Sequence, residues 1–201
     1  MSKKSIFFIF ILFIIYFIFS SISYSKSIST ELQNNLFRLH IIANSDSEED
    51  QALKLYIRDN LVKYLEQYTF KNKEEMISFL NNNKIEIEQQ IKSYIEEKGF
   101  SYTFSIEIGR SFFPKKEYGN IIVPSGLYDG IKIKIGKAEG KNWWCILFPP
   151  MCLIDSSTCE ITESSETILE NSLNDETFSI LFSETPEYNF KFKIVDFFNN
   201  L

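Results

Sequence analysis

Histidine, cysteine and glycine are scarce in this 201-residue sequence, and each shortage narrows its chemistry. There is a single histidine, His40, and the three cysteines at 145, 152 and 159 lack the paired Cys-x-x-Cys spacing of a structural zinc site. The seven glycines form neither a phosphate-binding loop nor a Gly-x-Ser-x-Gly elbow. The sequence therefore predicts no metal, no cofactor and no catalytic residue.

Positive charge is also in short supply. The chain has 27 acidic and 21 basic residues, and two of the bases, Lys3 and Lys4, precede an apolar N-terminal run. Residues 26–201 thus carry 27 acids against 19 bases, a net charge of −8. Such a surface repels phosphate backbones, so we expect no nucleic-acid partner. We also expect no small-molecule substrate.

The N-terminus has the order of an export signal. An unbroken apolar run, residues 6–19, follows the two lysines and leads into the serine-rich stretch 20–25. A 14-residue helix covers roughly 21 Å, against about 30 Å for a bilayer core, which favours a signal peptide over residues 1–25 cleaved after Ser23 or Ser25. An uncleaved anchor with membrane contact through residues 6–24 remains the alternative.

The rest of the chain is predicted to hold a short linker, residues 26–35, and one domain, residues 36–201. Residues 36–42 have the apolar density of a buried strand, and a helix is expected from near Ser47. Its apolar stripe is spaced by four: Leu53, Ile57, Leu61 and Leu65.

Further helices and strands follow from the periodicity. A helical stretch over residues 73–98, which the asparagines at 81–83 can split, ends at Gly99, and a strand with alternating apolar residues follows over 100–108. The later segments comprise a loop over 110–124, strands over 131–135 and 143–148, and helices near 167–173 and 175–182. The strand over 143–148 is apolar on both faces, so we expect it to be central in the sheet. The class of residues 188–201 stays open.

This order predicts an α+β fold. Two main helices pack on a mixed or mostly antiparallel sheet of at least four strands, after an N-terminal signal or anchor helix. Residues 156–201 are the least defined part of the domain.

The polar residues after the first strand allow two interpretations. His40, Ser45 and Asp46 contain the residue types of a catalytic triad, but triads are defined by geometry that sequence proximity does not supply. Residues 45–50 are also typical of a helix cap, and a cap can coexist with a functional contact. Trp143 and Trp144 are adjacent in a strand and must face opposite sides.

The cysteines also leave two alternatives open. In an exported protein, Cys145 and Cys152 can form a disulfide across the Pro149-Pro150 turn and leave Cys159 unpaired. Three reduced, mostly buried thiols are the other arrangement.

Two long segments carry a resemblance to a known family. Residues 38–55 (RLHIIANSDSEEDQALKL) and 140–152 (GKNWWCILFPPMC), with the Phe113-Pro114 and Tyr118-Gly119 pairs between them, resemble the signature segments of stage II sporulation protein R. The resemblance covers about residues 36–155. It departs from the family pattern at Met151 and Leu153 and fades after Asp155.

The resemblance implies a signal between two cells. Family members are made in the forespore and exported to the space between the forespore and mother-cell membranes. There they are required for activation of a membrane-embedded aspartic protease that processes pro-sigma-E in the mother cell. For this chain the resemblance implies an endospore signalling protein, secreted or N-terminally anchored, that activates the protease without being an enzyme.

We expect partner contacts from polar and aromatic residues near the end of the first strand and around the second motif. The predicted contact residues are His40, Asn44, Ser45, Asp46, Asp50, Tyr118, Asn142, Trp143 and Trp144.

Two rival hypotheses come from other classes of protein. One is an exported hydrolase that uses His40, and the other is a structural envelope protein held by an uncleaved N-terminal helix.

Overall fold

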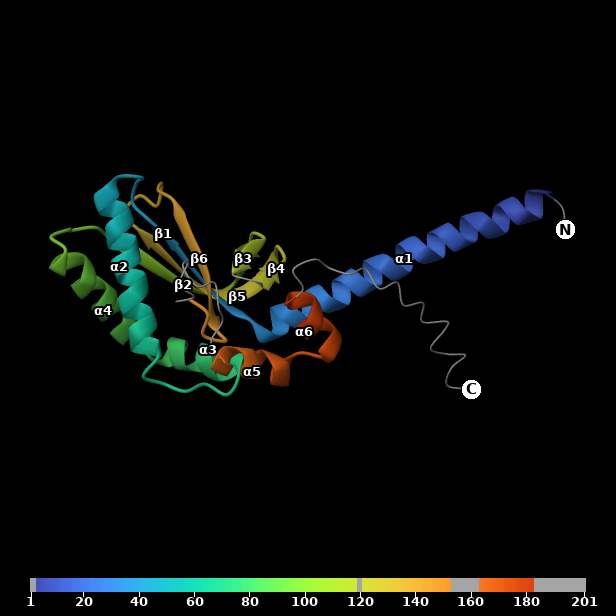
Figure 1. Ribbon diagram of the computed structural model, residues 1–201. Helices are drawn as coiled ribbons and strands as arrows, with labels where there is room; N and C mark the ends of the chain where they lie inside the picture. Colours follow the sequence, from blue (N-terminus) through green and yellow to red (C-terminus); the bar gives the residue numbers. More distant parts are fainter. Residues whose placement is uncertain (1–2, 119–120, 153–162, 183–201) are drawn as a thin grey trace.

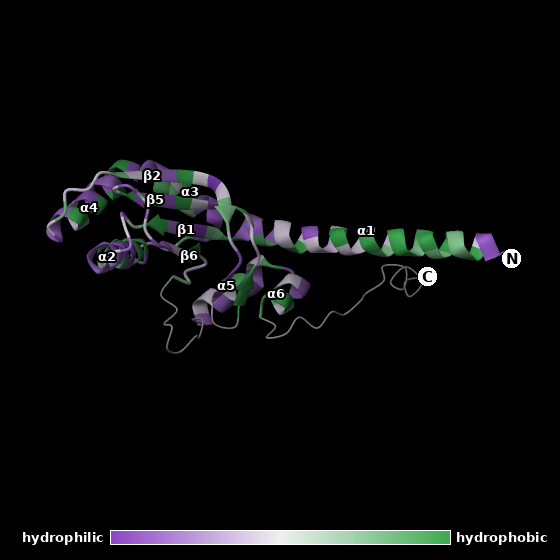
Figure 2. Ribbon diagram, turned by 90° about the horizontal axis from the view of Figure 1, so that it is seen from above, coloured by the Kyte–Doolittle hydropathy of each residue, from purple (hydrophilic) through white to green (hydrophobic). Residues whose placement is uncertain are grey.

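A four-stranded sheet forms the centre of the structure, a computed structural model that describes residues 3–118, 121–152 and 163–182. Its strands are β1 (Phe37–Ile42), β2 (Phe104–Phe113), β5 (Gly126–Ile135) and β6 (Asn142–Phe148). The strands, labelled in Figure 1, lie in the order β2-β5-β1-β6 (Figure 2), with β1 parallel to β5 and the other two pairings antiparallel. The sheet is therefore mixed, and the predicted α+β class is confirmed.

The β2–β5 pair differs from its predicted extent. The two strands pair over ten positions, from Phe104 opposite Ile135 to Phe113 opposite Gly126. Residues 100–103 are not in the strand because β5 ends at Ile135; beyond that pair, the Gly136 N–H donates to the Thr103 carbonyl at 2.7 Å. The predicted loop over 110–124 is wrong at its start, where the strand continues, and in its middle, where β3 (Lys116–Tyr118) and β4 (Ile121–Val123) form a two-stranded sheet.

The prediction of a central position for β6 is wrong, because within the described residues β6 pairs with β1 alone. Its apolar residues face two different clusters instead. Cys145 and Leu147 belong to the core beneath the helices, while Ile146 belongs to a second cluster on the opposite face. A strand at the edge of a sheet can thus be apolar on both faces when each face is covered.

Three helices cover one face of the sheet: α2 (Glu48–Leu65), α3 (Lys73–Asn82) and α4 (Lys84–Glu97). Ser47 caps α2 by accepting a hydrogen bond from the backbone N–H of Asp50 at 3.2 Å, and the predicted stripe of α2 is buried. Asn83 separates α3 from α4, and Gly99 follows α4 with a φ of 80°. The predicted split and stop of this helical stretch are confirmed.

Helix α1 (Lys3–Asn35) runs from the N-terminus to the sheet as one continuous helix of 33 residues. Figure 2 shows its apolar first part projecting away from the other elements. Within the described residues, it is the one helix long and apolar enough to cross a membrane, a property that a signal sequence shares. The structure is therefore compatible with both the signal and the anchor that the sequence predicts.

The expected linker over residues 26–35 is helical and forms the last turns of α1. Leu32 is buried there, and the following Leu36 is also buried, in a cluster that includes Phe113 and Tyr128. This apolar burial explains why the segment is not extended: Leu32, together with the following Leu36, covers the face of the sheet opposite α2.

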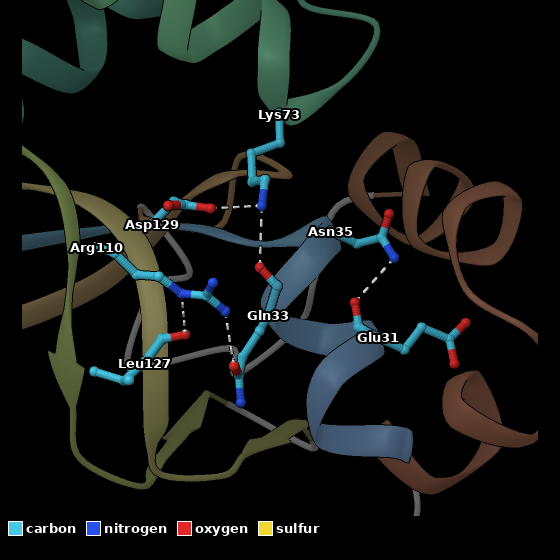
Figure 3. Close-up of polar contacts among 7 residues, drawn as sticks. All are labelled: Glu31, Gln33, Asn35, Lys73, Arg110, Leu127 and Asp129. Atoms are coloured by element: carbon cyan, nitrogen blue, oxygen red, sulfur yellow. Dashed lines mark hydrogen bonds and ion pairs between the residues drawn. The ribbon is translucent and has the colours of Figure 1, made fainter. Parts of the chain in front are cut away.

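Two cations fasten the end of α1 to the domain (Figure 3). Lys73 Nζ donates to the backbone carbonyl of Gln33 at 3.1 Å and pairs with Asp129 at 2.7 Å. Arg110 donates to the Gln33 side chain at 3.1 Å and to the carbonyl of Leu127 at 3.4 Å. A cation at the carbonyl end of a helix is favourable because that end carries partial negative charge.

Two short helices, α5 (Glu163–Ser172) and α6 (Asp175–Leu181), lie beside the end of α1, close to their predicted positions. Glu31 accepts hydrogen bonds from Asn174 and Thr177, which fix α6 against α1. The polar segment before residue 163, Cys159 and the unassigned tail 188–201 lie outside the described residues.

Candidate partner-binding surface

The four predicted contact residues between β1 and the first turn of α2, Asn44, Ser45, Asp46 and Asp50, lie in an internal hydrogen-bond network. Asp50 accepts from Asn44 at 2.8 Å and from Ser45 at 2.5 Å. Asn44 and Asp46 in turn accept from the backbone N–H groups of Lys137 and Lys141, at 3.0 and 2.7 Å. These side chains therefore tie the loop to the turn between β5 and β6.

Electrostatics support this structural role for Asp50. Burial acts to raise the pKa of its carboxyl, but hydrogen bonds from Ser45, Asn44 and Tyr102 outweigh that effect and hold the pKa below its usual value. The charged form is thus the one that the loop stabilises. The capping interpretation of this segment is realised, and a partner contact through its four polar residues remains a prediction.

A second group of the predicted residues meets on the sheet face opposite the helices. The pairing of the strands places Glu107, Lys132, His40 and Trp144 in one row across β2, β5, β1 and β6. The His40 ring donates from Nε2 to Asn142 Oδ1 at 2.6 Å and stacks on Trp144, with ring centroids 3.5 Å apart. His40 itself is buried, Trp144 is half-buried and Asn142 is exposed.

His40 is held neutral on this face. Burial lowers the pKa of its ring to about 4; the hydrogen bond to Asn142 opposes the shift, and the positive charges of Lys132, Lys134 and Arg38 add to it. Nδ1 is buried and has no hydrogen-bond partner within the described structure. His40 lacks the acid or hydroxyl contact that a triad needs in the part of the chain that is described, so the geometry gives the hydrolase hypothesis no support.

Charged side chains surround the His40–Trp144 stack. Glu107 lies 2.6 Å from the Lys134 ammonium and 3.9 Å from that of Lys132. The hydrogen bond from Lys134 is the main reason that the pKa of Glu107 is lowered. The sequence analysis did not select these three residues, although their alternation with buried isoleucines in β5 and β2 marked them as lying on the other face.

Tyr118 is half-buried and packs against the interior rather than joining the row that contains His40. Its hydroxyl accepts from Arg38 at 2.9 Å, and the fully buried Arg38 guanidinium lies 4.6 Å from the centre of the Phe113 ring and 5.1 Å from that of Tyr128. Arg38 also donates to the Pro114 carbonyl at 3.4 Å. Sequence reasoning missed Arg38, since a lone arginine in an apolar strand does not reveal the aromatic rings that will surround it.

The two tryptophans lie on opposite faces, as predicted. Trp143 lies on the helix side, where the Arg58 guanidinium is 4.1 Å from the centre of its ring. Both tryptophans are half-buried, and only Trp144 belongs to the row that contains His40.

The structure contains the Cys145–Cys152 disulfide, one of the two alternatives that the sequence left open. The two Cα atoms are 5.1 Å apart, within the range that a disulfide spans. Nowhere in the described ranges do three or more metal-ligating residues cluster.

These features define an α+β domain that follows an apolar helix compatible with a signal or an anchor, with a polar and aromatic row on the sheet face opposite the helices. The chain matches the family described as "Stage II sporulation protein R (spore_II_R)" over residues 33–158. It is also 36% identical, over 137 residues, to the stage II sporulation protein R of Bacillus subtilis strain 168. That match covers 67% of this chain and 61% of the relative. The chain therefore belongs to the stage II sporulation protein R family, and no solved structure matches it.

Proposed function

We propose that this chain is an exported sporulation signal that activates the membrane-embedded aspartic protease which processes pro-sigma-E in the mother cell. Membership of the stage II sporulation protein R family carries the proposal. The matched residues, 33–158, contain all four strands of the central sheet, the three helices on it and the row that contains His40. The match thus includes the candidate surface as well as the core.

The apolar helix α1 supports export. It provides a signal or an anchor that directs the domain out of the forespore, into the space between the two membranes. The disulfide is compatible with that destination, because disulfides persist in oxidising compartments outside the cytoplasm.

The proposed mechanism is binding without catalysis. A ligand activates a receptor by binding its active state more tightly than its inactive state. His40 is neutral, stacked and hydrogen-bonded to an amide, which suits a recognition surface better than proton transfer. The domain would thus act by contact with the extracytoplasmic part of the protease.

Complementation of a deletion strain tests this function. Sporulating cells that lack the gene receive either the whole chain or a chain without residues 2–25, and pro-sigma-E processing is followed by immunoblot. We expect processing only with the whole chain, because the shorter one stays in the forespore. If processing is normal in the deletion strain itself, the proposed function is wrong.

A matched control separates export from folding. The chain without residues 2–25 keeps Leu32 and Leu36, so its domain should fold. Attaching an unrelated cleavable signal peptide to it should restore processing. Failure of that chimera, despite its secretion, would instead assign a direct role in signalling to the apolar part of α1.

A further inference from the structure

The sheet face opposite the helices is covered at one end and open at the other. The end nearest α1 is covered by a cluster that includes Leu36, Phe113 and Tyr128. The far end presents side chains of all four strands: Ser105 and Glu107 from β2, Lys132 and Lys134 from β5, Ile42 from β1, and Asn142 and Trp144 from β6. We call these seven residues the open face.

Solvent accessibility confirms that the described residues leave this face uncovered. The side chains of Glu107, Lys134 and Lys132 are 54, 39 and 23% exposed. A Cβ atom built on Gly109, next to Glu107 in β2 on the side toward the cluster, meets no other residue within 4 Å. Gly130 lies opposite Gly109 and is covered by Phe113, since a Cβ atom built on Gly130 would lie 2.8 Å from Phe113 Cζ. The open face therefore ends at this row, on the side toward the cluster.

The charge of this face is opposite to that of the whole protein. The chain has a net charge of −6, whereas the open face carries two lysines against one glutamate. Arg38 adds a positive charge beneath the face, with hydrogen bonds to a hydroxyl and a carbonyl. Burial is the main cause that lowers the pKa of His40, and the positive charges of Lys132, Lys134 and Arg38 act in the same direction. An acidic partner would be repelled elsewhere and attracted here.

The apolar part of the open face suggests what else the partner presents. The stacked rings of His40 and Trp144 form an aromatic platform beside the lysines, and Ile42 lies next to it in the sheet. Planar side chains stack on such a platform, and half-buried tryptophans are frequent anchors at protein interfaces.

We propose that the open face binds an acidic segment of a partner protein, with carboxylates beside Lys132 and Lys134 and a planar side chain over Trp144. This inference rests on the proposed function in one respect, namely that the chain acts by binding a protein. The bilayer that would hold α1 is not the occupant, because β1 runs from the end of α1 toward the far end of the sheet.

Binding of defined peptides tests the chemistry without any knowledge of the partner. The probe is a fluorescent seven-residue peptide with four acidic residues around one tyrosine, and its control has four lysines in their place. The whole chain, in non-ionic detergent micelles, is titrated into each peptide and the polarisation is measured. We expect the acidic peptide to bind and the basic one not to bind, with affinity that falls as salt rises.

Three amide substitutions then assign the site. Lys132→Gln with Lys134→Gln should weaken binding of the acidic peptide about tenfold, the effect of losing two exposed charge pairs. Glu107→Gln should strengthen it about two- to threefold, a gain that a merely structural role does not predict. The matched control is Lys92→Gln on the solvent side of α4, whose side chain is 69% exposed, and it should change nothing.

Several outcomes would overturn the proposal. The first is equal binding of the two peptides. The second is a loss of affinity for the acidic peptide with Lys92→Gln that equals the loss with the double-glutamine variant. The third is displacement of the acidic peptide by nanodiscs that contain phosphatidylglycerol. The last result would assign the face to an anionic lipid surface instead.

Processing in cells separates this inference from the proposed function. If the double-glutamine chain is secreted normally, cells that carry it should process pro-sigma-E poorly. Normal processing in those cells would mean that the signal does not use the open face, whereas normal processing in the deletion strain would reject the function itself.

Discussion

The two faces of the central sheet are formed by the same strands but differ in burial and charge. On β1, Phe37, Leu39 and Ile41 are fully buried under the helices, while the intervening residues Arg38 and His40 point to the other side. The helix-covered face is apolar and closed, whereas the other contains a buried cation, a neutral histidine, two half-buried lysines and an exposed glutamate. The comparison shows that one strand can stabilise the fold with alternate residues and leave the rest available for recognition.

The largest difference between the faces should appear in stability. Ile133 is fully buried on the helix side of β5, so Ile133→Ala removes buried methylenes and leaves a cavity. We expect the free energy of unfolding to fall by about 2–5 kcal/mol, measured by urea denaturation of the whole chain in detergent. Ser105→Ala, a substitution of an exposed residue on the open face, is the control, and its free energy of unfolding should stay within about 0.5 kcal/mol of that of the original chain. Equal losses would contradict the division of the sheet.

The next largest effect concerns pH. The folded-state pKa of His40 is about 4, below the value near 6.5 of an unfolded chain, so between these values the unfolded chain binds a proton that the folded one does not. Stability contributed by neutral His40 is present above pH 6.5 and is lost as the pH falls to about 4. After a discount for solvent access, we expect a loss on the order of 2 kcal/mol.

His40→Gln isolates this contribution from that of the carboxylates. The difference in unfolding free energy between the two chains should change between pH 6.5 and 4 and be flat above pH 7. A pH-independent difference would show that burial does not shift the histidine.

The smallest effect on stability should come from the charges of the open face. Lys134→Gln breaks one exposed ion pair with Glu107, and such pairs contribute about 0–1 kcal/mol. We expect the free energy of unfolding, measured by urea denaturation, to change by less than about 0.5 kcal/mol, although the same substitution should weaken binding of the acidic peptide. A much larger loss would mean that Lys134 supports the fold and cannot report on binding alone.

Local patterns in the sequence predicted most of the fold. The spacing of Leu53, Ile57 and Leu61 identified α2, and the alternation of Ile131, Ile133 and Ile135 identified β5, because each pattern reflects burial on one side of one element. The position of β6 was not predictable in this way. Apolar residues on both faces of a strand show that both are covered, but not whether a further strand lies beside it.

The candidate surface was predicted only in part for a similar reason. His40, Asn142 and Trp144 were selected, and the structure brings them together. Lys132 and Glu107 were missed because their proximity to His40 depends on β1 lying between β5 and β6, a long-range pairing that no local pattern contains. Conversely, the side chains of Asn44 and Asp46 accept hydrogen bonds from the backbone of a turn almost one hundred residues away.

Because Lys73 and Arg110 hold the end of α1 against the domain, the helix and the sheet should move as one rigid unit. While α1 remains attached, a change in its tilt within a bilayer swings the sheet through the same angle. Over the roughly 20 Å length of a six-residue strand, a typical tilt of about 20° would displace the open face by about 7 Å. Bilayer thickness, which influences helix tilt, would then change the position of the open face relative to the membrane.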